Sequence, residues 1–309
     1  MSFSVLTAVR SFSSTSTMKM ALKNVTVIGS GLMGSGIAQV AAQTGHNVTL
    51  VDVSEPILQK ATASIKKSLE RVAKKKYSDN ASEGEKFVAE SLKRLTTNTS
   101  AEASAKSADI VIEAIVENVK VKQDLFKALD KAAPSSTLFA SNTSSLSITD
   151  IASATQRKDR FGGLHFFNPV PVMKLLEVIR TVDTSDDTYN KMMEFGKNLG
   201  KQTITCKDTP GFVVNRLLVP YMGEAMRMLE RGDATAKDID IAMKLGAGYP
   251  MGPFELMDYV GLDTTVFIME GWHEKYPDNP LFEPSKLLKK LVSEGKLGKK
   301  SGEGIYKYD

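Results

Sequence analysis

The sequence predicts an α/β protein with a doubly wound, mostly parallel sheet flanked by helices, followed by a second domain that is entirely helical. In the first two thirds of the chain, short β-branched runs alternate with stretches of helical periodicity, the pattern of parallel strands joined by crossover helices. Farther on, glycines and prolines separate segments whose apolar residues follow helical spacing. We therefore predict a sheet domain over residues 21–206 and a helical domain over residues 207–309.

The first domain begins with an apolar run that ends at a glycine, then a helical stretch, then a second apolar run that ends at an aspartate. This order of strand, helix and strand recurs along the domain. Strands are predicted at residues 25–28, 48–51, 110–115, 137–141, 161–167 and 175–180. Helices between them are predicted at residues 32–44, 57–76 and 120–131. These elements predict a doubly wound sheet that extends beyond the simplest dinucleotide-binding fold.

The second domain starts at a helix-start signal, Asp208-Thr209-Pro210-Gly211. Apolar residues then surround nearly the whole circumference of the next predicted helix, from Val213 to Met228. A helix of this kind must bury most of its surface against other elements. We therefore expect the helical domain to pack around it and to form a subunit interface as well.

Composition narrows the possible functions. Of 309 residues, 42% are hydrophobic and 25% are charged, as in globular proteins. The formal net charge is +4, and basic residues are interleaved with acidic ones, which argues against nucleic-acid binding. A single cysteine, Cys206, excludes a disulfide within the chain, and three scattered histidines suggest no metal cluster. No apolar run approaches the roughly 18 residues that a membrane span needs.

The N-terminal segment, residues 1–20, differs in composition from the rest of the chain. It contains Arg10 and Lys19, many serines and threonines, and no acidic residue, and the first acidic residue of the chain is Asp52. This composition is typical of a mitochondrial transit peptide. An ordinary disordered terminus is the alternative.

The turn after the first predicted strand, Gly29-Ser30-Gly31-Leu32-Met33-Gly34, matches the pattern G-x-G-x-x-G. The first glycine permits the tight turn, the second lets the backbone approach a pyrophosphate, and the third lets the helix pack closely on the strand. The positive N-terminus of the helix then faces the pyrophosphate. We predict that the cofactor-binding residues of this Rossmann-type turn are Gly29, Gly31, Leu32, Met33 and Gly34.

Asp52 ends the next predicted strand, about twenty residues after the first glycine. A carboxylate at this position accepts hydrogen bonds from the ribose hydroxyls of an adenosine and repels a 2′-phosphate. No arginine follows closely to neutralise it. The sequence therefore predicts NAD, and not NADP, as the cofactor.

A histidine and a glutamate later in the domain are candidates for acid–base chemistry. Two prolines, Pro169 and Pro171, lie between His165 and Glu177 and suggest a turn that brings the chain back. A carboxylate beside an imidazole fixes its tautomer and makes it a better general base. Dehydrogenation of an alcohol needs such a base, because hydride departure is coupled to loss of the hydroxyl proton. Without further context, a purely structural histidine is the alternative.

Several longer runs make the chain resemble one family. Besides the glycine turn, they are Glu113 to Asn118, Ala140 to Leu146, His165 to Pro171 and Asp208 to Arg216. With these runs the sequence is similar to the mitochondrial short-chain L-3-hydroxyacyl-CoA dehydrogenases over nearly the whole chain after the N-terminal segment. The resemblance implies NAD-dependent oxidation of a (3S)-3-hydroxyacyl-CoA to a 3-oxoacyl-CoA in fatty-acid β-oxidation. It also implies a homodimer and a location in the mitochondrial matrix.

The resemblance implies catalytic roles for individual residues. His165 would take the proton of the 3-hydroxyl group as hydride leaves C3 for the nicotinamide, and Glu177 would orient the imidazole. Ser144 would hydrogen-bond the substrate oxygen, close to both the nicotinamide and the CoA substrate. Asn215, from the second domain, would help place the reacting oxygen or the acyl carbonyl. The local sequence alone leaves a structural alternative for each: Ser144 as a residue of a turn, and Asn215 as a polar residue at a helix boundary.

Further contacts follow from the same resemblance. Cofactor contacts outside the glycine turn would come from Glu117, Lys122, Asn168 and Lys300. Ser68 and Lys75 share one face of the predicted helix 57–76 and would bind coenzyme A, with the lysine as a point charge for its phosphates. A solvated basic surface is the alternative for Lys75 and Lys300. The chain departs from close relatives at Ser30, where glycine is common.

Other functions stay open at this point. A related NAD-dependent dehydrogenase of a free hydroxy acid or sugar acid would need no phosphate site near Lys75. A non-enzymatic structural or NAD-sensing relative could share the fold, although the presence of both His165 and Glu177 argues against it. A regulatory contact with another mitochondrial enzyme through the helical domain would not exclude catalysis.

Overall fold

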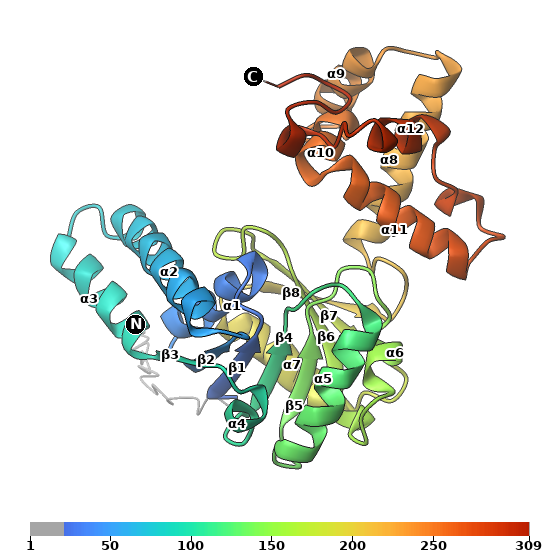
Figure 1. The fold of residues 1–309 in the computed structure, drawn as a ribbon. Helices are drawn as coiled ribbons and strands as arrows, with labels where there is room; N and C mark the ends of the chain where they lie inside the picture. The colour runs from blue at the N-terminus through green and yellow to red at the C-terminus, as the bar shows by residue number, and fades with distance from the viewer. Residues whose placement is uncertain (1–21, 309) are drawn as a thin grey trace, which may run out of the picture.

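The computed structural model describes residues 22–308. The predicted transit peptide, residues 1–20, lies outside the described residues. The chain forms a sheet with helices on both faces, and a separate group of helices follows toward the C-terminus (Figure 1). The predicted fold class is therefore confirmed.

One eight-stranded sheet runs through the first domain in the order β3-β2-β1-β4-β5-β6-β7-β8. Neighbouring strands are parallel except β6 and β7. The order of the first six strands reverses between β1 and β4, the place where doubly wound sheets bind ligands. The strands are β1 Asn24–Ile28, β2 Asn47–Val51, β3 Leu95–Asn98, β4 Ile110–Glu113, β5 Leu138–Ser141, β6 Phe161–Phe166, β7 Leu175–Arg180 and β8 Gln202–Lys207.

The strands that the sequence predicts are all present, but the prediction omits β3 and β8. Both lie at the edges of the sheet. The sequence of β3, Leu-Thr-Thr-Asn, is mostly polar, and that of β8, Gln-Thr-Ile-Thr-Cys-Lys, alternates weakly. Edge strands have one side unpaired and bury less surface, so they do not need the continuous apolar runs of the central strands.

Helices connect these strands and cover both faces of the sheet. α2 and α3 pack against each other beside α1, at the β3 side of the sheet (Figure 1). The helix bounds are α1 Leu32–Gln43, α2 Glu55–Lys76, α3 Ala81–Lys93, α4 Ala101–Ala105, α5 Val119–Ala132, α6 Ile148–Ala152 and α7 Asp186–Asn198. Side-chain oxygens cap the N-termini of α3 to α7, from Asn80, Ser100, Asn118, Ser147 and Ser185.

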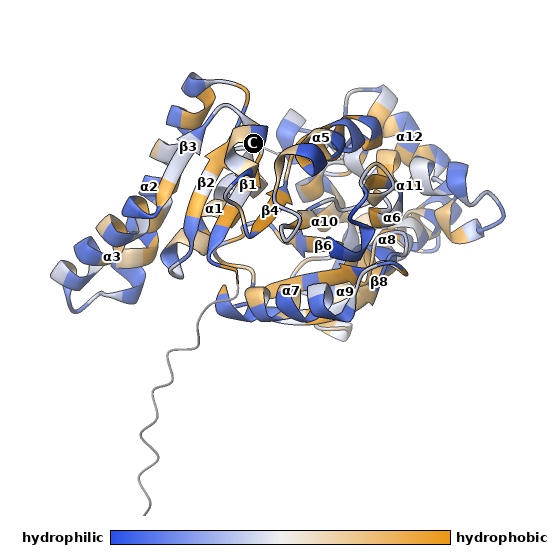
Figure 2. Cartoon of the chain, turned by 90° about the horizontal axis from the view of Figure 1, so that it is seen from below, coloured by the Kyte–Doolittle hydropathy of each residue, from blue (hydrophilic) through white to orange (hydrophobic). Residues whose placement is uncertain are grey.

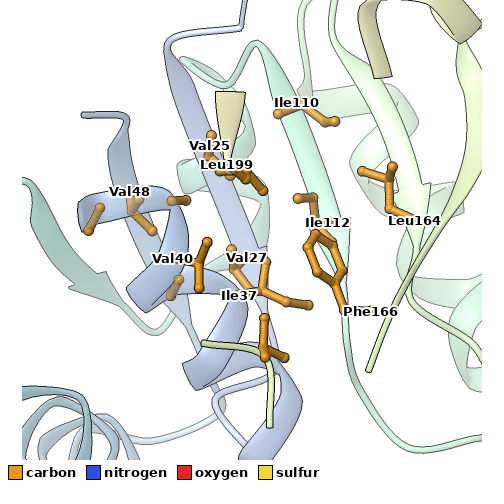
Figure 3. Close-up of a cluster of buried hydrophobic side chains, with 14 of the residues drawn as sticks. Val25, Val27, Ile37, Val40, Val48, Ile110, Ile112, Leu164, Phe166 and Leu199 are labelled. Atoms are coloured by element: carbon orange, nitrogen blue, oxygen red, sulfur yellow. The ribbon is translucent and has the colours of Figure 1, made fainter. Parts of the chain in front are cut away.

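Two apolar clusters fill the space between the sheet and its helices. Because alternate strand residues face opposite sides, Val25 and Val27 join the cluster under α1, α2 and α7, whereas Ile28 joins the cluster under α4, α5 and α6. Figure 3 shows the first cluster, where Ile37 and Val40 of α1 meet the strands. In Figure 2 the central strands are largely orange and the surrounding helices carry both colours, as expected for strands buried on both faces.

The C-terminal helices enclose a core of their own, in which Met257 and Met269 are fully buried. The helices are α8 Val214–Arg231, α9 Ala236–Gly246, α10 Pro253–Val260, α11 Leu262–Lys275 and α12 Lys286–Ser293. The buried carboxylate of Asp258 accepts hydrogen bonds from the backbone N–H groups of Ile305 and Tyr306. This contact fixes the C-terminal tail to α10.

Gly34 tests the close packing of α1 on the turn that follows β1, and Gly271 in α11 serves as its control. A Cβ at Gly34 would overlap the carbonyl oxygen of Gly29, whereas a Cβ at Gly271 in α11 would meet nothing within 4 Å. Gly34→Ala should therefore lower the free energy of unfolding by about 1–3 kcal/mol. Gly271→Ala should raise it by up to about 1 kcal/mol, because alanine favours the helix. Urea denaturation of both variants measures this, and equal stability of the two would contradict the packing described.

Candidate active site

A groove with a volume of about 590 Å³ opens beside the turn that follows β1. Its walls are the glycine turn together with Asp52, one face of α2, and residues 168–171 after β6. These segments all adjoin the carboxyl ends of parallel strands. The groove is therefore at the position where a doubly wound sheet binds a dinucleotide.

The glycine turn is shaped for a phosphate group. Gly29 has a φ of +96°, and a Cβ there would lie 2.5 Å from the carbonyl oxygen of Ala114. Around Gly31 there is nothing within 4 Å of a Cβ position, so a ligand can approach its backbone. Gly31 is also the N-cap of α1, which has no side-chain cap and no acidic residue in its first turn. The first N–H groups of α1 therefore fit the pyrophosphate of NAD.

The two apolar residues of the turn lie differently. Leu32 is exposed in the wall of the groove. Met33 packs against the core cluster beneath α1. Only Leu32 therefore presents its side chain to the groove, and the cofactor contact predicted for Met33 would involve its backbone.

Asp52 is held beside the glycine turn. Its Oδ2 accepts hydrogen bonds from the backbone N–H (2.7 Å) and the hydroxyl (2.6 Å) of Ser30, and its Oδ1 accepts one from the N–H of Val53 (2.7 Å). Burial alone would raise the pKa of Asp52, but these hydrogen bonds outweigh it and hold the pKa below its ordinary value. Oδ1 retains acceptor capacity for a ribose hydroxyl. The arrangement fits the adenosine ribose of NAD.

His165 and Glu177 are direct partners in the antiparallel pair of β6 and β7. His165 Nδ1 lies 2.6 Å from Glu177 Oε2, and the two residues are 3% and 0% exposed. Strand register explains the contact, since facing residues of an antiparallel pair share one side of the sheet. Because a carboxylate only accepts, we assign the proton to Nδ1 and the free lone pair to Nε2.

The other oxygen of Glu177 connects the sheet to the second domain. Oε1 accepts hydrogen bonds from the N–H groups of Val213 (3.1 Å) and Val214 (2.9 Å), where α8 begins. The preceding residue, Phe212, has a φ of +55°, which is unusual for a bulky residue. Its ring centre lies 5.4 Å from that of His165. Backbone strain thus occurs beside the imidazole, as is common at functional sites.

Ser144 and Asn215 complete the cluster around His165. Ser144 Oγ lies 3.0 Å from His165 Nε2, and Asn215 Nδ2 donates to the backbone oxygen of Ser144 over 3.4 Å. Ser144 lies in the turn after β5, whereas Asn215 lies in the first turn of α8. Hydrogen bonds thus connect the four predicted catalytic residues in one series. Asn215 comes from the helical domain, and Ser144, His165 and Glu177 come from the sheet domain.

Glu117 and Lys122 lie next to the turn that carries Ser144. Glu117 accepts hydrogen bonds from the backbone of this turn, and Lys122 is buried in an ion pair with Glu117. A third residue, Glu113, shares the Lys122 ammonium and is absent from the sequence prediction. The pattern offered a signal for it, a glutamate at the end of a wholly apolar strand.

Asn168 begins the segment that forms one wall of the groove. Lys201 holds this segment, because its Nζ donates to the carbonyl oxygens of Val170 (2.5 Å) and Met173 (2.7 Å). Burial lowers the pKa of Lys201. On the opposite side Val170 packs on Gly36, where a Cβ would lie 2.8 Å from the valine Cβ. The sequence carries no motif that reveals Lys201, because its partners lie some thirty residues away.

The residues predicted to bind coenzyme A lie on α2. Ser68 lines the groove together with Lys60, Ser64 and Arg71, at spacings that place them on one stripe of the helix. Lys75 is exposed one turn farther along this stripe and is not part of the groove wall. The prediction omits Lys60, Ser64 and Arg71, although their helical spacing from Ser68 is a usable signal.

Lys300 is not among the residues that line the groove. Its Nζ pairs with Asp263 at the start of α11, at 2.6 Å from Oδ1 and 2.8 Å from Oδ2. The structure therefore places this lysine within the helical domain, and its contact with the cofactor stays a prediction.

Two negative findings concern residues 22–308. No group of three or more histidine, cysteine, aspartate or glutamate side chains in this range is arranged to hold a metal ion. Within the same range, every helix falls short of the length and apolarity that crossing a membrane requires.

Comparisons with known proteins show the family to which the chain belongs. Residues 24–209 match the family model "3-hydroxyacyl-CoA dehydrogenase, NAD binding domain", and residues 211–308 match "3-hydroxyacyl-CoA dehydrogenase, C-terminal domain". The mitochondrial hydroxyacyl-coenzyme A dehydrogenases of Sus scrofa and Homo sapiens are 60% and 61% identical to the chain, with 100% of each chain covered. The solved (S)-3-hydroxybutyryl-CoA dehydrogenase from Ralstonia eutropha has a TM-score of 0.88 at 43% identity, covering 93% of this chain and 99% of that chain. This chain belongs to the 3-hydroxyacyl-CoA dehydrogenase family.

Proposed function

We propose that this protein is an NAD-dependent dehydrogenase that oxidises (3S)-3-hydroxyacyl-CoA to 3-oxoacyl-CoA. The observation that carries the proposal is the hydrogen-bonded series of Ser144, His165 and Glu177 beside the dinucleotide groove. The names of the relatives support it, since two are hydroxyacyl-coenzyme A dehydrogenases and the solved one is an (S)-3-hydroxybutyryl-CoA dehydrogenase.

His165 is the general base in this proposal. Its Nδ1 proton is held by Glu177, so the lone pair of Nε2 is free to accept the proton of the substrate 3-hydroxyl group. As the C3–H bond breaks with its electron pair, Nε2 takes that proton and the C3–O bond becomes a carbonyl. The Glu177 carboxylate, 2.6 Å from Nδ1, stabilises the imidazolium that forms. Bound NAD supplies the hydride acceptor.

The neighbours of His165 would place the substrate and exclude water. Ser144 Oγ, at 3.0 Å from Nε2, would hydrogen-bond the reacting oxygen, and Asn215 would fix that oxygen or the acyl carbonyl. The rings of Phe167 and Phe212 lie 4.5 and 5.4 Å from the imidazole ring. Apolar rings at this range keep the proton transfer away from solvent.

The two ligands would occupy neighbouring parts of the site. The glycine turn would hold the NAD pyrophosphate and Asp52 the adenosine ribose, and Asn168 would close the groove. Ser68 and Arg71 of α2, with Lys75 beyond them, would bind coenzyme A. Basic side chains on one stripe suit its phosphates, which a free hydroxy acid lacks.

The remaining features of the proposal concern the whole chain. Residues 1–20 would direct the protein to the mitochondrial matrix, which the mitochondrial relatives support. The domains would meet between residues 206 and 207, just before the last residue of β8. A homodimer would form through the helical domain, where Leu217, Leu245 and Phe267 are exposed large apolar residues.

Replacement of His165 tests the base. His165→Gln should lower kcat with NAD and 3-hydroxybutyryl-CoA by at least about 100-fold, because the variant loses the imidazole that accepts the hydroxyl proton. Titration calorimetry should show nearly unchanged NAD binding. His273→Gln, in α11, is the control and should keep normal turnover. Near-normal turnover by the His165 variant would contradict the mechanism.

Replacement of Asp52 tests cofactor choice. Asp52→Ala should reduce the preference for NAD over NADP, measured as the ratio of the two kcat/KM values, by at least about tenfold. The variant loses the carboxylate that accepts hydrogen bonds from the ribose hydroxyls of NAD and that repels the 2′-phosphate of NADP. Glu55→Ala removes a nearby exposed charge that does not line the groove. An equal effect in both variants would indicate general electrostatics instead of ribose recognition.

Replacement of Arg71 tests the acyl-CoA substrate against a free hydroxy acid. Arg71→Met should raise KM for 3-hydroxybutyryl-CoA by about tenfold, since a phosphate contact is lost. The control is Lys66→Met, because Lys66 is exposed on α2 and does not line this groove. Free CoA should inhibit the unaltered protein competitively. Turnover of free 3-hydroxybutyrate without inhibition by CoA would favour the alternative.

A further inference from the structure

Lys201 is a buried cation that has no role in the proposed mechanism. It lies between α7 and β8, and 9% of its surface is exposed. Within residues 22–308 its ammonium forms no ion pair, and its hydrogen bonds go to carbonyl oxygens. A buried charge without a counter-ion is costly, and a methionine would occupy a similar volume without a charge. The ammonium should therefore contribute something other than stability.

The ammonium holds the loop that connects β6 with β7, residues 167–174. Its Nζ donates to the carbonyl oxygens of Val170 (2.5 Å) and Met173 (2.7 Å). The backbone N–H of the next residue, Gln202, donates to the carbonyl oxygen of Lys174 (2.7 Å). The loop contains two prolines, which have no N–H group to donate. Much of its anchoring therefore comes from residues 201 and 202.

The same loop forms one wall of the groove beside the glycine turn. Residues 168–171 line this wall. The Val170 side chain packs on Gly36 of α1, where a Cβ would lie 2.8 Å from the valine Cβ. α1 is the helix whose N-terminus fits the pyrophosphate of NAD. Val170 is thus held twice, by α1 through its side chain and by Lys201 through its carbonyl oxygen.

We propose that Lys201 is a positioning residue for the cofactor, because its ammonium fixes the loop wall of the groove at the place that bound NAD requires. Lys201 is not among the residues that line the groove, so it acts through the loop that carries Asn168. A wall that is already ordered saves the cost of ordering it when the ligand binds. This inference rests on the proposed NAD-dependent function and specifies what holds one side of its cofactor groove.

A purely structural role for Lys201 is the competing explanation. Loss of a structural lysine would lower the free energy of unfolding but would leave the folded molecules with their ordinary affinity for NAD. Loss of a positioning lysine would also weaken NAD binding by the folded molecules. The Kd for NAD, measured where each variant is fully folded, therefore separates the two explanations.

The test compares Lys201→Met with Lys197→Met, a control in α7 whose side chain is exposed and does not line the groove. NAD binding to the full-length proteins is measured by calorimetry, and turnover with (3S)-3-hydroxybutyryl-CoA. We expect Lys201→Met to raise the Kd for NAD at least about fivefold. Its kcat with both ligands saturating should fall less than about threefold, because strand pairing holds His165 and Glu177. The control should match the unaltered protein.

Hydrogen exchange locates the change within the molecule. In Lys201→Met, the backbone N–H groups of residues 168–174 should exchange at least about tenfold faster than in the unaltered protein, whereas those of β6 and β7 should not. Lys201→Arg retains a charged donor and should bind NAD more tightly than Lys201→Met does.

Lys201→Gln keeps the test decisive if the methionine variant fails to fold. Glutamine has an uncharged donor on a side chain that is one atom shorter, so it should hold the loop only in part. We expect a rise of at least about twofold in the Kd for NAD, together with faster exchange in residues 168–174.

Two results would overturn the positioning role while leaving the dehydrogenase function intact. One is an unchanged Kd for NAD in folded Lys201→Met and Lys201→Gln, which would make the lysine purely structural. The other is a raised KM for the acyl-CoA with an unchanged Kd for NAD, which would assign the wall to the substrate. Absence of NAD binding or of turnover in the unaltered protein would instead refute the proposed function, so the two failures are distinguishable.

Discussion

The remainder of the structure depends on the carboxylate of Glu177. This group is buried, and its two oxygens interact with different parts of the chain. One oxygen holds Nδ1 of His165 and sets which ring nitrogen is free, and the other accepts the N–H groups of Val213 and Val214 where the helical domain begins. A single charge therefore defines the base and joins the sheet to the first helix of the second domain. Its loss would leave several buried donors without an acceptor.

Other carboxylates along the same edge of the sheet also hold the backbone of neighbouring segments. Asp52 follows β2, Glu113 ends β4, and Glu177 lies in β7. Each carboxylate accepts hydrogen bonds from backbone N–H groups at the start of a neighbouring loop or helix, so each one fixes the path of the chain as it leaves the sheet. The fixed segments are the dinucleotide turn, the approach to α5 and the start of α8. Charge-assisted hydrogen bonds suit this purpose because they are short and directional.

Sequence periodicity identified the central strands because they are buried on both faces and form continuous apolar runs. It missed the edge strands β3 and β8 and the helices α3 and α7, whose exposed sides dilute the apolar pattern. Among the candidate site residues, local motifs pointed to the glycine turn and Asp52. The resemblance to a family supplied Ser144 and Asn215. Neither source singled out Glu113 as a site residue, although it ends an apolar strand. Lys201 has no motif, because its partners are distant in the sequence.

The sequence by itself determined the fold class, the dinucleotide turn and the preference for NAD, because each rests on residues close together in the chain. It also offered His165 and Glu177 as a pair, through the prolines between them. Only the tertiary structure decided that Ser144, the imidazole and the first turn of α8 meet, and that Glu117 accepts hydrogen bonds from the backbone of the serine turn. The reason is strand register. The residues at the ends of β1, β4 and β5 become neighbours through pairing between strands, and no local periodicity encodes that pairing.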